Sequence, residues 1–299
     1  MSASTSAPAR DNQRTARGPA VRATLLAILV ANAIVVGAKL AIGIRTETLT
    51  VLGAALESGL DMLNNVMGIL LIDLAARAPD EDHPYGHDKF ETLGALGIVG
   101  FLSISCFELL REGVSTLLSG RAPHHASSVE VGVLAATMLV NVFVVWYERR
   151  RGRELQSAFL LADAAHTVSD VYVTGLALAS LVLARVGYPA LDAVLAIVVA
   201  LIIAWTGYGI LKETVPILVD QRGADPEELR TAIVAIAGVH DVRGIRSRLT
   251  ASGTLFAEVT IGVSEEMSVA DAHRLADEVE GCIASRYGAA EVTVHVEPV

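Results

Sequence analysis

The residues of this chain that could do chemistry are acidic and imidazole side chains set at helical spacing within apolar segments. Glu57 and Asp61 are four residues apart. His166 and Asp170 repeat that spacing in a later segment, and Asp163 precedes His166 by three residues. Side chains four apart on a helix share a face. A charged side chain at membrane depth costs at least about 2.5–3.5 kcal/mol, so we expect these groups to face a partner or a water-filled path.

Two such pairs on two helices offer four ligands to one divalent cation. Carboxylates and an imidazole in a set of four suit the tetrahedral site that Zn²⁺ prefers. The same donors accept Fe²⁺, Mn²⁺, Co²⁺ or Cd²⁺, so ligand type does not decide the metal. The alternative is a buried ion-pair cluster that only orients helices. One histidine cannot neutralise four carboxylates without a bound cation or raised pKa values. The pattern therefore predicts a divalent-metal site inside a membrane bundle.

The composition is that of an α-helical membrane protein. Hydrophobic residues make up 53% of the chain, and the mean hydropathy is +0.51. At about 1.5 Å per residue, six apolar stretches are each long enough to cross a hydrocarbon core of about 30 Å. We place these stretches at 23–44, 50–76, 90–117, 128–147, 155–184 and 190–211. They define a six-helix transmembrane domain over residues 23–212.

The basic residues predict the orientation of the chain. Residues 1–22 are rich in Ser, Ala, Pro and Arg, and we expect a disordered tail there. This tail and the connection 148–154 (Glu-Arg-Arg-Arg-Gly-Arg-Glu) are basic, which favours the cytoplasmic side. An even number of spans then places both termini in the cytoplasm.

Residues 213–299 form a different kind of segment. They contain 15 acidic and 7 basic residues, which accounts for −8 of the net charge of −10. This balance excludes a basic footprint for nucleic acid. The patterns predict a helix, two strands, a second helix and a third strand. We expect a small cytoplasmic α+β domain of order αββαβ, open-faced like a metallochaperone module. Its small size favours stabilisation by a second copy of the chain.

Two motifs carry a resemblance to a known family. These are Ala162-Asp163-Ala164-Ala165-His166-Thr167-Val168-Ser169-Asp170 and Asp80-Glu81-Asp82-His83-Pro84-Tyr85-Gly86-His87. Together with the six spans and the α+β domain, they resemble the cation diffusion facilitator family. The resemblance implies a homodimeric antiporter that exports a cytoplasmic divalent cation in exchange for protons by alternating access. It also implies an integral protein of the bacterial inner membrane.

The resemblance also implies three metal sites. The transport site maps to Glu57, Asp61, His166 and Asp170, and it departs from the family at Glu57, where members more often have Asp or His. A His there is associated with zinc selectivity, so its absence implies broader specificity. The turn site maps to Asp80, His83 and His87; the alternative is that Pro84 and Gly86 shape a tight turn in which these histidines only form hydrogen bonds. The cytoplasmic site maps to His240, His295 and Glu297, with Thr260 where a further His is expected and Glu258 on the same strand face.

Two alternatives to a transporter were considered from the sequence. A non-transporting metal sensor or partner subunit would keep the same fold. A membrane-embedded hydrolase lacks a nucleophile triad and the His-Glu-x-x-His signature. We therefore predict a transporter, not an enzyme, with divalent metals (Zn²⁺ first) as substrate and regulatory ligand and with no organic cofactor. Its expected partners are a second copy of the chain, the lipid bilayer and protons, and not nucleic acid.

Overall fold

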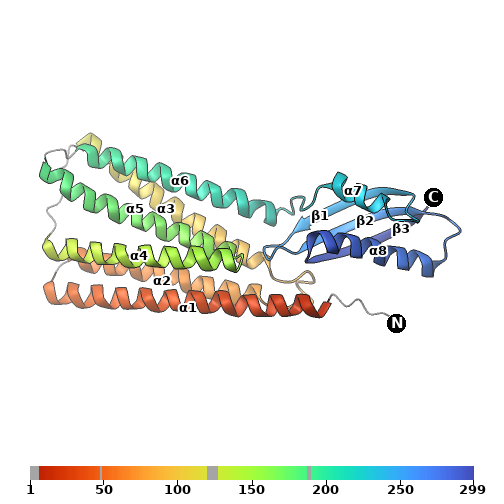
Figure 1. The fold of residues 1–299 in the computed structure, drawn as a ribbon. Helices are drawn as coiled ribbons and strands as arrows, with labels where there is room; N and C mark the ends of the chain where they lie inside the picture. Colours follow the sequence, from red (N-terminus) through yellow and green to blue (C-terminus); the bar gives the residue numbers. More distant parts are fainter. Residues whose placement is uncertain (1–6, 48, 120–126, 187–189) are drawn as a thin grey trace. The chain divides into compact units, whose positions relative to one another are not determined.

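The computed structural model describes residues 7–47, 49–119, 127–186 and 190–299. The chain divides into two compact units, with a boundary between Thr214 and Val215. The first unit is a bundle of long helices, and the second is a small α+β domain (Figure 1).

Six helices build the bundle, and their order confirms the predicted fold class. They are α1 (Ala7–Thr46), α2 (Leu49–Ala75), α3 (Lys89–Ser119), α4 (Ser128–Glu154), α5 (Ala158–Val186) and α6 (Ala190–Leu218). Within the described residues, all but α5 have the length and apolar character needed to cross a membrane. Helix α5 is 29 residues long and carries Asp163, His166 and Asp170 within an otherwise apolar sequence.

The N-terminal segment differs from the prediction. We expected residues 1–22 to be disordered, but α1 begins at Ala7. The Arg17 side chain donates to the backbone carbonyl of Leu155 (2.8 Å) and lies 2.9 Å from Glu91. Val21 is only 1% exposed. We expected disorder because a segment rich in Ser, Ala, Pro and Arg cannot bury a core of its own. In the fold, Arg17 and Val21 lie against the rest of the bundle.

The ends of two other helices also extend beyond their predicted bounds. The arginine-rich segment 148–154 is the last part of α4 and not a connection. Arg150 and Arg151 pair with Glu154 at helical spacing (2.9 and 2.8 Å), and positive charge is favourable at a helix C-terminus. Helix α6 likewise continues to Leu218, past the predicted boundary at residue 212.

Close packing around Phe159 brings three helices of the bundle together. The Phe159 ring is fully buried. A Cβ atom at Gly68 of α2 would clash with this ring, and one at Gly94 of α3 would lie 2.7 Å from it. Since Phe159 stands in the first turn of α5, these two glycines let α2 and α3 approach that helix. This approach positions Asp61 of α2 near His166 of α5.

The second unit follows the predicted order αββαβ. Its elements are α7 (Pro226–Val234), β1 (Asp241–Leu249), β2 (Leu255–Val263), α8 (Val269–Tyr287) and β3 (Ala290–Pro298). The central strand, β2, pairs antiparallel with β1 and parallel with β3. Asp225 caps α7 and Ser268 caps α8, so the polar residues that predicted these helix starts perform that role.

The sheet of this domain has one covered face. Ala257, Val259 and Ile261 alternate along β2 and are buried in the domain core with Leu229 and Val279 of the two helices. The opposite face of β2 carries Glu258 and Thr260, which are exposed and half-buried. This arrangement confirms the predicted open-faced α+β domain.

Candidate metal centre

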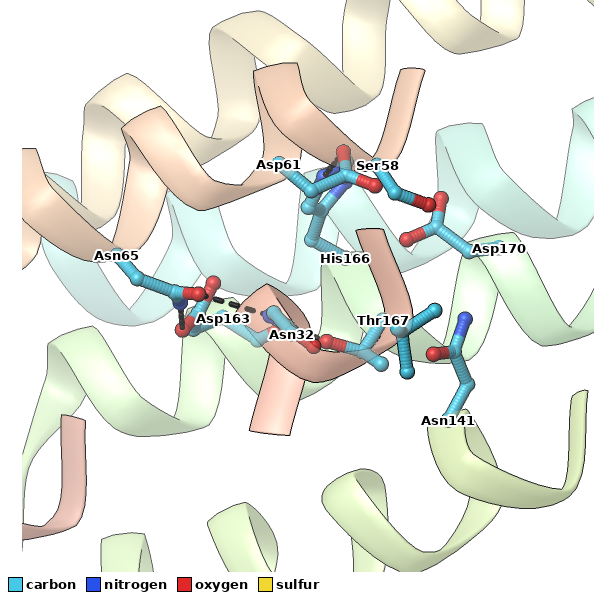
Figure 2. A pocket seen from close by; sticks show the side chains of 10 residues that line it. Asn32, Ser58, Asp61, Asn65, Asn141, Asp163, His166, Thr167 and Asp170 are labelled. Atoms are coloured by element: carbon cyan, nitrogen blue, oxygen red, sulfur yellow. Dashed lines mark hydrogen bonds and ion pairs between the residues drawn. The ribbon is translucent and has the colours of Figure 1, made fainter. Parts of the chain in front are cut away.

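A polar cavity lies within the bundle between α1, α2, α4 and α5 (Figure 2). Its lining consists almost entirely of polar side chains: Asn32, Val35, Ser58, Asp61, Asn65, Asn141, Asp163, His166, Thr167 and Asp170. Helix α5 supplies four of these residues at a spacing of three or four, so they share one helix face.

Three predicted ligands meet in this cavity. Asp61, His166 and Asp170 each offer a ligand atom, and these atoms lie within 4.8 Å of one another. The Nε2 atom of His166 is 3.5 Å from Oδ1 of Asp61. His166 is 7% exposed, and neither of its ring nitrogens has a hydrogen-bond partner. Leaving a buried polar atom without a partner is costly, and a cation bound at Nε2 between the two carboxylates would remove that cost.

The fourth predicted ligand, Glu57, lies on α2 one turn before Asp61. Its side chain is outside the described residues. Asp163 lines the same cavity but is not in the group of three. Its Oδ2 atom accepts a hydrogen bond from Asn65 Nδ2 (3.0 Å), and Asn65 in turn accepts from Asn32 (2.9 Å).

Several residues that line the cavity were not predicted from the sequence. Ser58 and Asn65 lie three residues before and four residues after Asp61, so helical spacing could have identified them. Asn32 and Asn141 belong to other helices, and no local pattern in the sequence connects them to the site.

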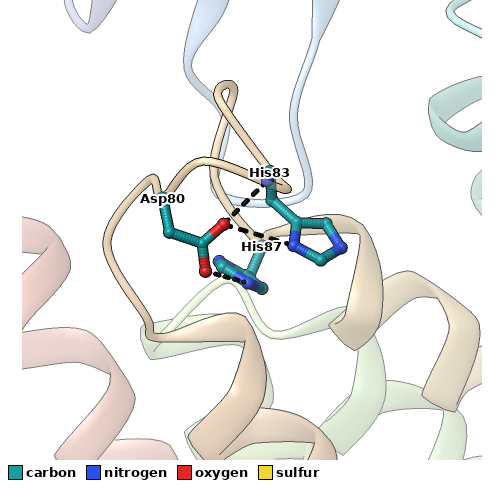
Figure 3. Close-up of side chains that lie close together, drawn as sticks. All are labelled: Asp80, His83 and His87. Carbon is teal, nitrogen blue, oxygen red and sulfur yellow. Dashed lines mark hydrogen bonds and ion pairs between the residues drawn. The ribbon is translucent and has the colours of Figure 1, made fainter.

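The turn between α2 and α3 brings its three predicted ligands together (Figure 3). The two oxygens of Asp80 lie 3.4 Å from His83 Nδ1 and 3.4 Å from His87 Nε2. Oδ1 of Asp80 also accepts the backbone N–H of His83 (2.7 Å), which holds the pKa of Asp80 below its usual value. Gly86 has a φ of +86°, which glycine adopts without strain. The tight turn and the ligand group therefore occur together.

The α+β domain holds a different arrangement. His295 Nε2 lies 3.6 Å from Glu297 Oε1, but among the described residues His240 does not join them in a group of three ligands. Arg243 occupies this cluster instead: its Nη1 is 2.5 Å from Glu297 Oε2, and its Nε is 3.3 Å from Asp241 Oδ2. The two carboxylates raise the pKa of Arg243.

Sheet geometry explains this cluster. Gly262 of β2 pairs in register with both Asp241 and Glu297 on the flanking strands. The register of β1 shifts between Val242 and Gly244. Such a bulge re-aims the side chain of the extra residue, here Arg243. Thr260, where a further His was expected, is the register partner of His295.

The fold defines an integral membrane protein, and Asp61, His166 and Asp170 inside its helical bundle could hold a metal ion. Sequence comparison agrees with this class. A family model described as "Cation efflux transmembrane domain" matches residues 25–219, and one described as "Cation efflux protein, cytoplasmic domain" matches residues 222–299. The chain therefore belongs to the cation efflux family, and it is a transporter and not an enzyme.

Individual relatives cover nearly the whole chain. The "Cation-efflux pump FieF" of Cronobacter sakazakii is 29% identical over 281 residues, which span 93% of this chain and 92% of the relative. The protein of the same name from Salmonella newport is 27% identical over 258 residues, or 85% of this chain and 84% of the relative. A solved structure of the MamM CTD is 24% identical over 24% of this chain and 92% of that chain, with a TM-score of 0.23.

Proposed function

We propose that this protein exports divalent metal cations from the cytoplasm in exchange for protons by alternating access. The observation that carries the proposal is the meeting of Asp61, His166 and Asp170 inside the bundle. Two carboxylates and a buried imidazole without a hydrogen-bond partner form a strong site for a divalent cation, and intramembrane ionisable groups mark ion pathways. The relatives named as cation-efflux pumps support the direction of transport.

The donor set favours Zn²⁺ and admits other metals. One nitrogen and several oxygens suit tetrahedral Zn²⁺, and Glu57 completes a set of four in our proposal. The same donors accept Fe²⁺, Mn²⁺, Co²⁺ and Cd²⁺. A glutamate on α2 adds an oxygen where an imidazole would add a softer nitrogen, which supports a broad specificity that includes Zn²⁺ and Fe²⁺.

Proton exchange follows from ligand chemistry. Histidine must be neutral, and carboxylates must be ionised, to coordinate a metal, so metal binding releases protons. A site that opens to a more acidic exterior would regain protons as the metal leaves. Alternating exposure of the Asp61–His166–Asp170 group to the two sides thereby couples metal export to proton entry.

Several features support the orientation and assembly that we propose. Arg149, Arg150, Arg151 and Arg153 at the end of α4 favour a cytoplasmic position for that end. Six spans then place both termini in the cytoplasm of a bacterial cell, with the bundle in the inner membrane. The small acidic domain, open on one sheet face, supports dimerisation through residues 213–299.

Flux in sealed vesicles tests this function. We expect purified protein in proteoliposomes to move Zn²⁺ against its gradient when a pH gradient is imposed, and to stop when a protonophore collapses that gradient. The Asp61→Asn variant keeps the side-chain size and serves as the matched inactive control. Metal binding without flux would instead support a sensor or partner subunit that does not transport.

A further inference from the structure

Two buried carboxyl groups lie beside the central site without being part of its three-ligand group. Asp163 of α5 is 2% exposed, and Glu148 of α4 is fully buried. The hydroxyl of Thr167 donates to Glu148 Oε2 (3.2 Å), while Oε1 of the same carboxylate has no hydrogen-bond partner. The two carboxyl groups are close enough to repel one another when both are ionised.

The charge of this pair is not balanced by the neighbouring arginines. Arg150 and Arg151, which follow Glu148 on α4, pair with Glu154. Asn65 and Thr167 donate hydrogen bonds to the pair, and the two carboxyl groups also lie within hydrogen-bonding reach of one another. Buried charges are normally paired or bound to metal, because an isolated one is expensive. Two adjacent buried carboxyl groups therefore need either a shared proton or a cation between them.

The position of the pair connects it to the central cavity. Asp163 and Thr167 line that cavity (Figure 2), and the Thr167 hydroxyl donates to Glu148. Asp163 precedes His166 by three residues on α5, so it lies about 4.5 Å closer to the N-terminal end of that helix. This end of α5 directly follows the arginine-rich C-terminal end of α4 in the chain. The side chains of Asp163 and Thr167 offer only oxygen atoms as metal ligands, whereas His166 offers a nitrogen.

We propose that Asp163, Glu148 and the hydroxyl of Thr167 form a second cation position, through which the transported ion passes before it reaches His166. Oxygen ligands suit a divalent ion that still keeps part of its water shell. The ion would complete its dehydration at the nitrogen-containing group of Asp61, His166 and Asp170. This proposal rests on the proposed export function, since it names an entry step toward the same cavity.

The test counts bound Mn²⁺ by electron paramagnetic resonance in the purified full-length chain. Mn²⁺ is the probe because it favours oxygen donors. All variants carry two background substitutions. His166→Ala removes the histidine of the central group, and His87→Ala removes the buried histidine of the turn group. We expect Glu148→Gln and Asp163→Asn, added separately, each to lose one Mn²⁺ per protomer at saturation. The matched control is Glu154→Gln, which removes one charge from the same helix and should keep the count.

Equal Mn²⁺ counts in Glu148→Gln, Asp163→Asn and the control would overturn the proposal. If either carboxyl variant also released fewer protons than the control when Mn²⁺ binds, the pair would hold a proton instead of a cation. Size-exclusion elution and thermal unfolding report whether each variant folds. If the carboxyl variants do not fold, Thr167→Val in the same background should weaken Mn²⁺ binding at least about tenfold, and unchanged affinity would overturn the proposal. Binding counts do not depend on flux, so failure of the export function would be seen separately in the vesicle assay.

Discussion

The central group in the bundle and the cluster on the cytoplasmic sheet use the same kinds of residues for different purposes. Asp61, Asp170 and His166 form the first. Asp241, Glu297 and His295 contribute to the second, with Arg243 between its two carboxylates. In the bundle the two carboxylates lie beside a histidine, whereas on the sheet an arginine of the same chain lies between the carboxylates.

Burial separates the two regions further. The His166 side chain is 9% exposed, and that of His295 is 69% exposed. A buried imidazole without a hydrogen-bond partner gains much from a bound metal, whereas an exposed one is already hydrated. Exposed ion pairs such as that of Arg243 with Glu297 contribute little stability. Residue type alone therefore does not identify a metal site; burial and the nearest fixed charge decide.

The largest effect expected from this comparison is a loss of transport. Asp61→Ala and His166→Ala should each reduce Zn²⁺ flux in proteoliposomes by more than about 100-fold, because even residues behind the ligands of metal sites cost 10–100-fold when they are replaced. His295→Ala should leave flux near normal, since that histidine lies in the cytoplasmic cluster. Near-normal flux in either bundle variant would show that the transport site lies elsewhere.

A smaller effect is expected when the guanidinium is removed from the sheet. Arg243→Ala frees the carboxylates of Asp241 and Glu297 beside His295 and should raise Zn²⁺ affinity of the isolated domain 213–299 about tenfold. Calorimetry measures this change. The matched control is Arg286→Ala, which breaks the exposed ion pair with Glu228 in the same domain. Equal affinities in the two variants would mean that Arg243 does not occupy a potential metal position.

Much of the fold could be predicted from the sequence because its signals are local. Apolar runs predict the six helices of the bundle, and Asp225 and Ser268 mark the starts of α7 and α8. Some errors occur where a distant partner matters. Arg17, within α1, pairs with Glu91, which is 74 residues away.

The candidate sites divide in the same way. Helical spacing unites His166 with Asp170, and a short turn unites Asp80 with His83 and His87, so both groups could be predicted. The polar partners of Asp163 lie on other helices and have no local signature. In the cytoplasmic domain, the cluster around Arg243 depends on strand register and a bulge, which the sequence alone does not specify. The proposed role of Glu57 stays a prediction.

A further prediction sharpens the central site by changing its selectivity. Glu57→His lowers the negative charge and adds a softer nitrogen donor, so we expect the ratio of Zn²⁺ to Mn²⁺ flux to rise several-fold, or about 1 kcal/mol in relative barrier. Glu57→Gln removes the charge without adding an imidazole and separates the two causes. An unchanged ratio in Glu57→His would show that another residue sets the preference.

The smallest effect concerns proton release at the turn site, where the carboxyl group of Asp80 is ionised before metal binds. The backbone N–H of His83 lowers the pKa of Asp80 below 3.8, so its ionised form is favoured in the folded chain. A lowered pKa stabilises the fold above pH 3.8, and this contribution is lost as the pH falls through the lowered value. Between about pH 5 and 8, Asp80 therefore has no proton to release when metal binds. In an Asp61→Ala background, Asp80→Asn should weaken Zn²⁺ binding at the turn without changing the number of protons released. Calorimetry in buffers of different ionisation enthalpy measures that number, and a lower value in Asp80→Asn would show that Asp80 is protonated before metal arrives.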